Sequence, residues 1–269
     1  MEQWFESDIK ANGITIHYRR TGGDKPPLVL LHGHTDNGMC WVRVTKALEQ
    51  SYDLIMLDAR GHGLSERMNQ PTSSTDLARD ALAAIDALGL ERPGVMGHSM
   101  GASTAAVAAA LAPEKISRLV LIDPPWLDVP RSPQHDDTRE RNFMGLIKNP
   151  LDEIINIGRQ TIAGAHEDLI RAWAESKLQV DTQIFRMLHL EPNFFTWHQL
   201  PGIECPFLLL IGDPALGGLV TPKTAQEITE TWKQGRWAQI ENVGHLIHFQ
   251  QEEASIAAIR AFLDEFPPT

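Results

Sequence analysis

The most regular feature of the chain is a series of short apolar runs separated by stretches with helical periodicity. Residues 14–19 alternate between apolar and polar types, which predicts a half-buried strand. Later runs are almost continuously apolar, as is typical of strands buried on both faces of a parallel sheet. These runs cover residues 28–32, 53–58, 94–99, 118–123 and 206–212, with a weaker one at 236–240.

The stretches between these runs favour helices. In residues 75–90 apolar side chains recur every three or four positions, and Gly89 ends the pattern. Residues 102–113 are small on every side, which suits a helix packed closely on a sheet, and a last helix is expected at about 252–266. Strands alternating with helices in this way predict an α/β fold with a parallel sheet.

The rhythm changes between residues 125 and 200. This segment opens with a proline- and charge-rich passage, continues with two helical patterns and contains no strand-like run. We interpret it as a helical insertion over the sheet, so that residues 1–124 and 201–269 form the core domain. Aromatic residues collect in the insertion and predict either its own core or the wall of a substrate pocket. They are Trp126, Phe143, Trp173, Phe185, Phe194, Phe195 and Trp197.

Composition narrows the class of protein. The 269 residues carry a formal net charge of −11, which argues against binding to nucleic acid or to an anionic membrane. No apolar run approaches the length of about 18 residues that a membrane span needs, and no secretory signal is visible. Cys40 and Cys205 lie far apart without metal-binding or redox spacing. Two isolated thiols suit a reducing compartment, so a cytoplasmic location is predicted.

The first chemical signal is Gly-His-Ser-Met-Gly at residues 97–101, between a predicted strand and a predicted helix. A G-x-S-x-G sequence in this context lifts the serine out on a tight turn, where it can act as a nucleophile. The helix that follows directs its positive end toward the same point. A plain glycine turn is the simpler alternative. The flanking strand and helix favour Ser99 as a nucleophile.

A serine nucleophile needs a base and an acid that orients it. His245 follows Gly244 in a turn after the last predicted strand and is the preferred base, whereas His248 is expected either to pack in the core or to support the site from behind the catalytic residues. Two carboxylates end predicted strands and compete for the role of acid. We prefer Asp213, which ends the run at 206–212, and keep Asp123, which ends the run at 118–123, as the second choice.

The oxyanion that forms during attack needs two backbone N–H donors. Met100 follows the nucleophile and supplies one, and His34 in the stretch His-Gly-His-Thr-Asp-Asn (residues 32–37) supplies the second. The two histidines of that stretch are weak evidence for a metal, and none is expected. Residues 58–65, Asp-Ala-Arg-Gly-His-Gly-Leu-Ser, lack the order of a phosphate-binding loop. They predict a structural turn in which Asp58 and Arg60 could pair.

Taken together, these motifs resemble those of the α/β-hydrolase fold superfamily, in the same order along the chain. They are "HGHTDN", "DARGHGLS", "GHSMG", "LIDPP", "LLLIGD" and "VGHLIHF". The resemblance implies an eight-stranded, mostly parallel sheet flanked by helices, a helical cap insertion over the active site, and no cofactor. One position departs from the family pattern. The acid usually stands three residues after Gly212, where this chain has Ala215, so that Asp213 or Asp123 must take its place.

The leading hypothesis is therefore a serine hydrolase that cleaves a small, moderately apolar carboxylic ester or lactone through an acyl-enzyme. A carbon–carbon bond hydrolase of the meta-cleavage type would use the same three residues, and a cofactor-free oxygenase would use the same base. A non-catalytic small-molecule receptor is the alternative from another class, because the same fold carries both. Only chemistry at the site can separate these hypotheses.

Overall fold

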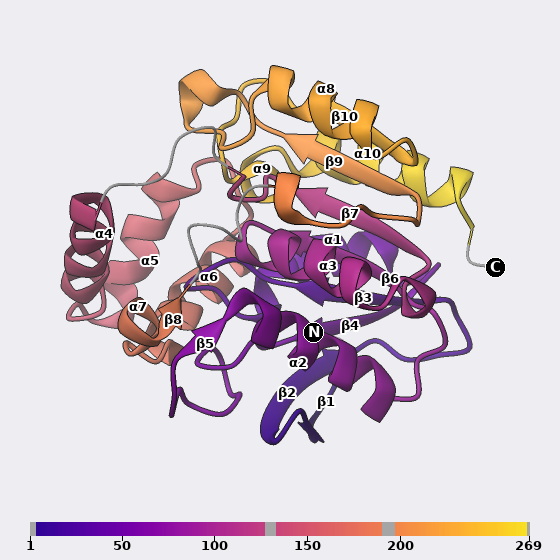
Figure 1. Ribbon diagram of the computed structural model, residues 1–269. Coiled ribbons are helices and arrows are strands. Elements are labelled where there is room, and N and C mark those ends of the chain that lie inside the picture. Colours follow the sequence, from indigo (N-terminus) through magenta and orange to yellow (C-terminus); the bar gives the residue numbers. More distant parts are fainter. Residues whose placement is uncertain (1–3, 127–132, 190–196, 268–269) are drawn as a thin grey trace.

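The computed structural model describes residues 4–126, 133–189 and 197–267, and its centre is a twisted sheet (Figure 1). Within these residues the sheet has eight strands in the order β1-β2-β4-β3-β6-β7-β9-β10. They are β1 (Phe5–Ala11), β2 (Ile14–Arg20), β3 (Pro27–Leu31), β4 (Asp53–Leu57), β6 (Gly94–His98), β7 (Arg118–Ile122), β9 (Phe207–Ile211) and β10 (Gly235–Gln239). β2 pairs antiparallel with β1 and with β4, and the remaining pairs are parallel. The predicted α/β fold with a mostly parallel sheet is confirmed.

The first strand, β1, was not predicted. Its sequence, Phe-Glu-Ser-Asp-Ile-Lys-Ala, is mostly polar and largely solvent-facing because it lies at the edge of the sheet. β1 and β2 are joined by a turn in which Asn12 and Gly13 both have positive φ, 47° and 79°. Asn-Gly favours this hairpin geometry. The turn signal was therefore available, although the hydrophobic pattern of the strand was too weak.

Helices cover both faces of the sheet, which explains the continuous apolar runs. In β3, Val29 and Leu31 join the apolar cluster that α2, α3 and α8 cover, whereas Leu28 and Leu30 join the cluster that α1 and α10 cover. These helices are α1 (Val42–Leu48), α2 (Ser74–Ala87), α3 (Met100–Leu111), α8 (Pro222–Thr231) and α10 (Glu252–Glu265). α1 and α8 were not predicted from the sequence.

The predicted helical insertion is present between β7 and β9, and it lies to one side of the sheet in Figure 1. It contains α4 (Pro133–Leu146), α5 (Leu151–Thr161), α6 (Glu167–Gln179) and the short α7 (Ile184–Met187). It also contains β8 (Leu188–His189), which pairs with β5 (Thr72–Ser73). The expectation of no strand in the insertion was wrong, because a two-residue strand is too short to show a periodicity.

The aromatic residues of the insertion divide between different parts of the molecule. Trp126 and Trp197 pack edge-on against Trp232, with ring centroids 5.8 and 5.9 Å away, and so belong to the core beside the sheet. Phe143 and Phe185 contact each other at 5.1 Å in a small cluster of the insertion itself. Trp173 packs in the cluster that α1 covers. Phe194 and Phe195 lie outside the described residues.

In the described ranges 4–126, 133–189 and 197–267, no helix is both long and apolar enough to cross a bilayer.

Candidate active site

Ser99 lies in the sharp turn between β6 and α3. Its backbone has φ 53° and ψ −116°, a conformation that non-glycine residues rarely adopt. The Ser99 N–H donates to the carbonyl oxygen of Ile122 at 2.9 Å, which ties the turn to the end of β7. A strained backbone at a strand-to-helix turn is the geometry that carries the serine above the edge of the sheet.

The two glycines of the turn are required by close packing. A Cβ atom on Gly97 would lie 2.2 Å from the carbonyl oxygen of Gly101. A Cβ atom on Gly101 would lie 2.1 Å from the carbonyl oxygen of Leu31, at the end of β3. Neither distance can be accommodated. The absence of side chains therefore brings the start of α3 against the end of β3, where the loop with His34 begins.

His245 and Asp123 meet at the same edge of the sheet. His245 lies in the loop between β10 and α9 (Ile247–Gln250), and its Nδ1 is 2.7 Å from Oδ2 of Asp123. The Asp123 side chain is fully buried, and its carboxylate also accepts hydrogen bonds from the N–H groups of Leu219 and Val220 at 2.9–3.2 Å. An Nδ1–H that donates to a carboxylate leaves the lone pair on Nε2, where a base needs it.

Asp213, the acid preferred from the sequence, is placed differently. Its Oδ1 accepts a hydrogen bond from the N–H of Ala215 at 2.8 Å and so caps the short helix η4 (Pro214–Leu216). The structure thus brings Asp123, the second choice, to His245 and leaves Asp213 in its own turn. The physical reason is that the later part of the same loop directs the N–H groups of Leu219 and Val220 at Asp123.

The two expected oxyanion donors lie on neighbouring segments. Met100 is the first residue of α3, where backbone N–H groups have no acceptor within the helix. His34 follows Gly33 in the loop after β3. A Cβ atom on Gly33 would lie 2.9 Å from Nδ1 of His98 and 3.2 Å from Oδ2 of Asp36, so this loop approaches the serine turn closely only because Gly33 has no side chain.

Residues 58–65 support the loop with His34. The N–H of Ala59 donates to Nε2 of His32 at 2.9 Å, and Nδ1 of His32 bonds the carbonyl oxygen of Gly33 at 2.8 Å. His62 is buried and makes a similar bridge, because its Nε2 accepts the N–H of Thr35 at 3.4 Å. Burial and the nearby His32 lower the pKa of His62 to about 3, so the ring stays a neutral acceptor.

Arg60 of the same stretch does not pair with Asp58. Its guanidinium makes a two-point ion pair with the Asp80 carboxylate on α2, with N···O distances of 2.5 and 2.6 Å. Asp58 instead accepts the N–H groups of Gly38 at 2.7 Å and Leu64 at 2.9 Å. The pairing considered from the sequence was therefore wrong. Asp58 accepts hydrogen bonds from the loops before and after β4, and Arg60 binds α2 through Asp80.

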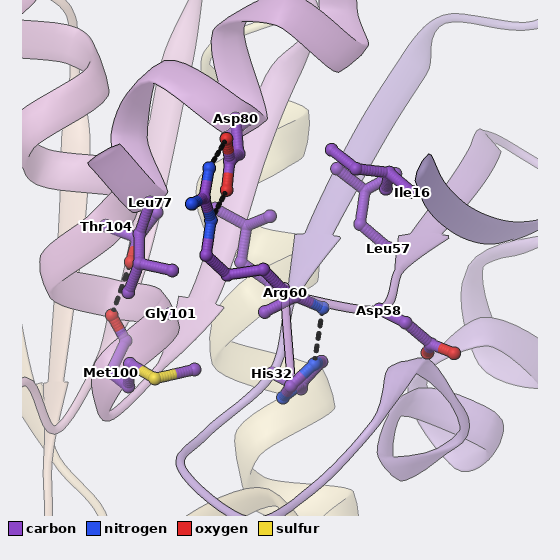
Figure 2. A pocket seen from close by; sticks show the side chains of 13 residues that line it. Ile16, His32, Leu57, Asp58, Arg60, Leu77, Asp80, Met100, Gly101 and Thr104 are labelled. Atoms are coloured by element: carbon purple, nitrogen blue, oxygen red, sulfur yellow. Dashed lines mark hydrogen bonds and ion pairs between the residues drawn. The ribbon is translucent and has the colours of Figure 1, made fainter. Parts of the chain in front are cut away.

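A small cavity of about 30 Å³ lies beside the first turn of α3. Met100, Gly101 and Thr104 form one wall, and Figure 2 shows the Arg60–Asp80 pair beside it. This volume holds only one or two water molecules. Neither Ser99 nor His245 lines it, so it is not a substrate site.

Two further buried histidines surround His245. His98 donates from Nε2 to the carbonyl oxygen of His245 at 3.0 Å, and the two rings are 4.7 Å apart. Burial, together with the nearby His245, lowers the pKa of His98 to about 3. His248 is buried against Trp41, with ring centroids 4.5 Å apart, which agrees with the predicted packing role. Burial also lowers its pKa well below the usual value, so both rings are neutral at pH 7.

A buried ion pair adjoins the loop with His34. Lys177 of α6 and Asp36 are 3% and 5% exposed, and they form a hydrogen-bonded salt bridge. Nearby, the side-chain amide of Asn37 donates to Oε1 of Gln179 at 2.7 Å. Asp36 and Asn37 belong to the motif at residues 32–37, whereas Lys177 belongs to none of the predicted motifs. No local signal identifies a lysine 141 positions away as the partner of Asp36.

The insertion also reaches the His34 side chain. Nη2 of Arg139, on α4, is 3.4 Å from Nδ1 of His34, and the ring of Phe185 lies edge-on to that of His34 at 5.2 Å. The guanidinium group of Arg139 and the ring of Phe185 therefore lie next to the loop with His34. Across the described ranges, no three His, Cys, Asp or Glu side chains are grouped as a metal site.

The chain is similar to known proteins over nearly its full length. Residues 26–252 match the model of the alpha/beta hydrolase fold family. An N-formylmaleamate deformylase of Pseudomonas putida is 32% identical over 272 residues, which cover 96% of each chain. An esterase of Escherichia coli is 25% identical over 89% of this chain and 93% of its own.

A solved structure gives the same result. The N-formylmaleamic acid deformylase of Pseudomonas putida S16 superposes with a TM-score of 0.76 at 25% identity, covering 95% of this chain and all of that one. The match of residues 26–252 and the full-length relative at 32% identity establish that this chain is a member of the alpha/beta hydrolase fold family of hydrolases.

Proposed function

We propose that the chain is a serine hydrolase of small acyl compounds in which Ser99, His245 and Asp123 form the catalytic triad. The observation that carries the proposal is the hydrogen bond of 2.7 Å between Nδ1 of His245 and the buried Asp123 carboxylate. It orients the imidazole and stabilises its charged form, as a general base for a serine requires.

The proposed reaction has two halves. Nε2 of His245 accepts the proton of Ser99 while Oγ attacks the carbonyl carbon, and the N–H groups of His34 and Met100 stabilise the oxyanion. Collapse of the tetrahedral intermediate breaks the bond to the leaving group, which takes the proton from His245. His245 then deprotonates a water molecule that attacks the acyl-enzyme, and the acid departs as Ser99 regains its proton.

For the scissile bond, the sequence favours a carboxylic ester or lactone, and the comparisons add a formamide. The deformylase relative acts on N-formylmaleamate, which carries a carboxylate. Arg139 beside His34 supports such a substrate, because a guanidinium pairs strongly with a carboxylate. The second candidate function is therefore hydrolysis of the formyl C–N bond in a small carboxylate-bearing amide.

Activity assays with a matched pair of variants test the triad. We expect the parent to hydrolyse p-nitrophenyl acetate or N-formylmaleamate and Ser99→Ala to lose at least about 10⁴-fold in kcat. Ser103→Ala, a buried serine one turn along the same helix, is the control and should keep the parent rate. A Ser99→Ala variant as active as the parent would refute the proposal.

The charge of the substrate distinguishes the two candidate functions, because N-formylmaleamate carries a carboxylate and p-nitrophenyl acetate is neutral. Arg139→Met should raise KM for N-formylmaleamate about tenfold or more while leaving neutral p-nitrophenyl acetate unaffected. Arg141→Met, an exposed arginine on the same helix, is the control and should change neither value. Equal effects of Arg139→Met on both substrates would remove the argument for a carboxylate.

Two further outcomes apply if neither substrate is turned over. Ser99-dependent cleavage of a dienoate 1,5-diketone would assign carbon–carbon hydrolysis. Ligand binding without turnover would assign a receptor.

A further inference from the structure

Lys177 is a buried cation of the insertion that contacts the loop with His34. Its ammonium group donates to the carbonyl oxygen of Thr35 at 3.0 Å and to the Asp36 carboxylate. It also stands 4.7 Å above the ring of Trp173, one turn earlier on α6. An ammonium group removed from water is stable only when such partners replace its hydration. Lys177 therefore holds the Thr35 carbonyl group and the Asp36 carboxylate in place, and they in turn stabilise its charge.

Thr35 is the point where this loop is strained. Its φ is 69°, in the left-handed region that β-branched residues avoid. Its N–H donates to Nε2 of His62 at 3.4 Å and its carbonyl oxygen accepts from Lys177, so both backbone polar groups are held by side chains from other segments. Strain of this kind persists only where the surroundings impose it, and it is concentrated at functional sites.

His34 is the residue directly before Thr35, and its N–H is one of the two proposed oxyanion donors. Because the two residues are adjacent, a change in the backbone angles of Thr35 would alter the path of the loop at His34. A donor helps catalysis only if it is already aimed at the developing charge. We therefore expect the conformation of Thr35 to influence where the proposed donor N–H of His34 points.

We propose that Lys177 is a positioning residue for the oxyanion hole, through which helix α6 of the insertion takes part in acyl transfer by holding Thr35 and Asp36. This inference rests on the proposed function, because it needs an oxyanion to form at Ser99. It gives the insertion a role in the rate of the chemical step. Lys177 itself touches no substrate in this proposal.

The alternative is that Lys177 merely docks α6 on the core, and the molecule contains a matched control. At the other end of α6, Asp168 forms an ion pair with Lys46 of α1 at 2.6 Å. Lys46 thus fastens the same helix without contacting residues 33–37 in the hydrogen bonds or ion pairs recorded for the described ranges. Lys46→Met removes a docking contact, whereas Lys177→Met removes a docking contact and the support of Thr35.

The experiment measures the rate of Ser99 labelling by a fluorophosphonate probe, and kcat and KM for p-nitrophenyl acetate where the parent turns it over. Both reactions place an oxyanion in the proposed hole. We expect Lys177→Met to lower the labelling rate and kcat about 10- to 100-fold, with KM within about twofold of the parent. Lys46→Met should stay within about twofold of the parent in all three values.

Inhibition by a trifluoromethyl ketone is a second measurement, and it reports on the oxyanion hole separately from turnover. The inhibition constant of a small alkyl trifluoromethyl ketone should rise with Lys177→Met by the same factor as kcat falls, because the adduct on Ser99 carries an oxyanion. Binding of a neutral product such as p-nitrophenol should not change. A parallel loss of affinity for both compounds would indicate a general disturbance of the site and would overturn the inference.

Lys177→Met leaves the Asp36 carboxylate buried without its partner, which can prevent folding. Lys177→Met combined with Asp36→Asn removes both charges, and it should fold while showing the same 10- to 100-fold loss. Parent-like labelling in this folded double variant would overturn the inference and leave the triad untouched, provided that Ser99→Ala is inactive. A parent that neither labels nor turns over would instead overturn the proposed function, and this inference with it.

Discussion

Two neighbouring loops at the carboxyl edge of the sheet each carry an aspartate near their start, and the two carboxylates have different roles. Asp123 follows β7 in a strained conformation, with φ 42°, and its buried carboxylate binds His245 and the N–H groups of Leu219 and Val220. Asp213 follows β9 with an extended backbone, and its half-buried carboxylate caps its own turn at Ala215. The strands are adjacent in the sheet, but the carboxylates have different partners.

A position at the end of a strand is therefore not enough to bring a carboxylate to His245. The loop after β9 still contributes to the site, because its backbone holds the carboxylate that comes from β7. An acid for this role needs a rigid, buried position beside the base, and three N–H···O contacts from one loop provide that rigidity.

The largest expected effect comes from changing the buried carboxylate. Asp123→Asn keeps the size of the side chain but removes the charge and disturbs the tautomer of His245. We expect kcat to fall about 10³- to 10⁴-fold in ester or formamide hydrolysis, as such a substitution does in other serine triads. The measurement is kcat for Asp123→Asn against the parent at pH 7. A loss smaller than tenfold would contradict the proposed role of Asp123.

Low pH is the next test, because the Asp123 side of the site contains the buried neutral histidines His98 and His248, whereas residues 213–218 contain no histidine. Burial lowers the pKa of His98 and of His62 to about 3. The unfolded chain binds protons at these groups below about pH 6.5, whereas the folded chain does not, so their contribution to stability is present above pH 6.5 and is lost as the pH falls toward 3.

Each of these two groups should cost about 2 kcal/mol of unfolding free energy between pH 7 and pH 5. Urea unfolding at both pH values measures the loss. His98→Asn should reduce the difference between the two pH values by about half of the joint effect of His98 and His62. An unchanged difference would show that His98 is protonated as easily in the folded chain as in the unfolded one.

An intermediate effect is expected where the loop after β9 meets the loop with His245. A Cβ atom on Gly212 would lie 2.0 Å from the carbonyl oxygen of Gly244. Gly212→Ala should therefore destabilise the fold by about 1–3 kcal/mol, measured by urea unfolding, and lower activity by displacing His245. The control is Gly145→Ala in α4, where a Cβ atom meets nothing within 4 Å and where a small gain in stability is expected.

The smallest effect is expected from a change to Asp213, the half-buried aspartate. Asp213→Asn keeps an oxygen that can accept the N–H of Ala215, and asparagine is also a good cap. We expect kcat/KM to stay within about threefold of the parent and stability within about 0.5 kcal/mol. If instead Asp213→Asn lost activity a hundredfold while Asp123→Asn did not, the assignment of the two carboxylates would have to be reversed.

Much of the fold could be predicted because its signals are local. The buried strands are apolar on both faces, α2 has a clear helical periodicity, and α3 is a run of small residues, so their existence follows from the sequence. The edge strand β1 escaped prediction because its exposed side chains are polar. The serine turn was predictable for the same local reason, since Gly97, Ser99 and Gly101 stand within five positions of one another.

The sequence by itself thus determined the α/β architecture, the helical insertion and the serine turn, because hydrophobic periodicity and glycine spacing act over a few residues. Only the tertiary structure decided which carboxylate reaches His245 and which cation holds Asp36, across 122 and 141 positions of the chain. Such partners are selected by the register of β7 and β9 and by the docking of α6. Hydrogen bonding and ion pairing depend on distances in space, and these distances are set only when the whole chain packs.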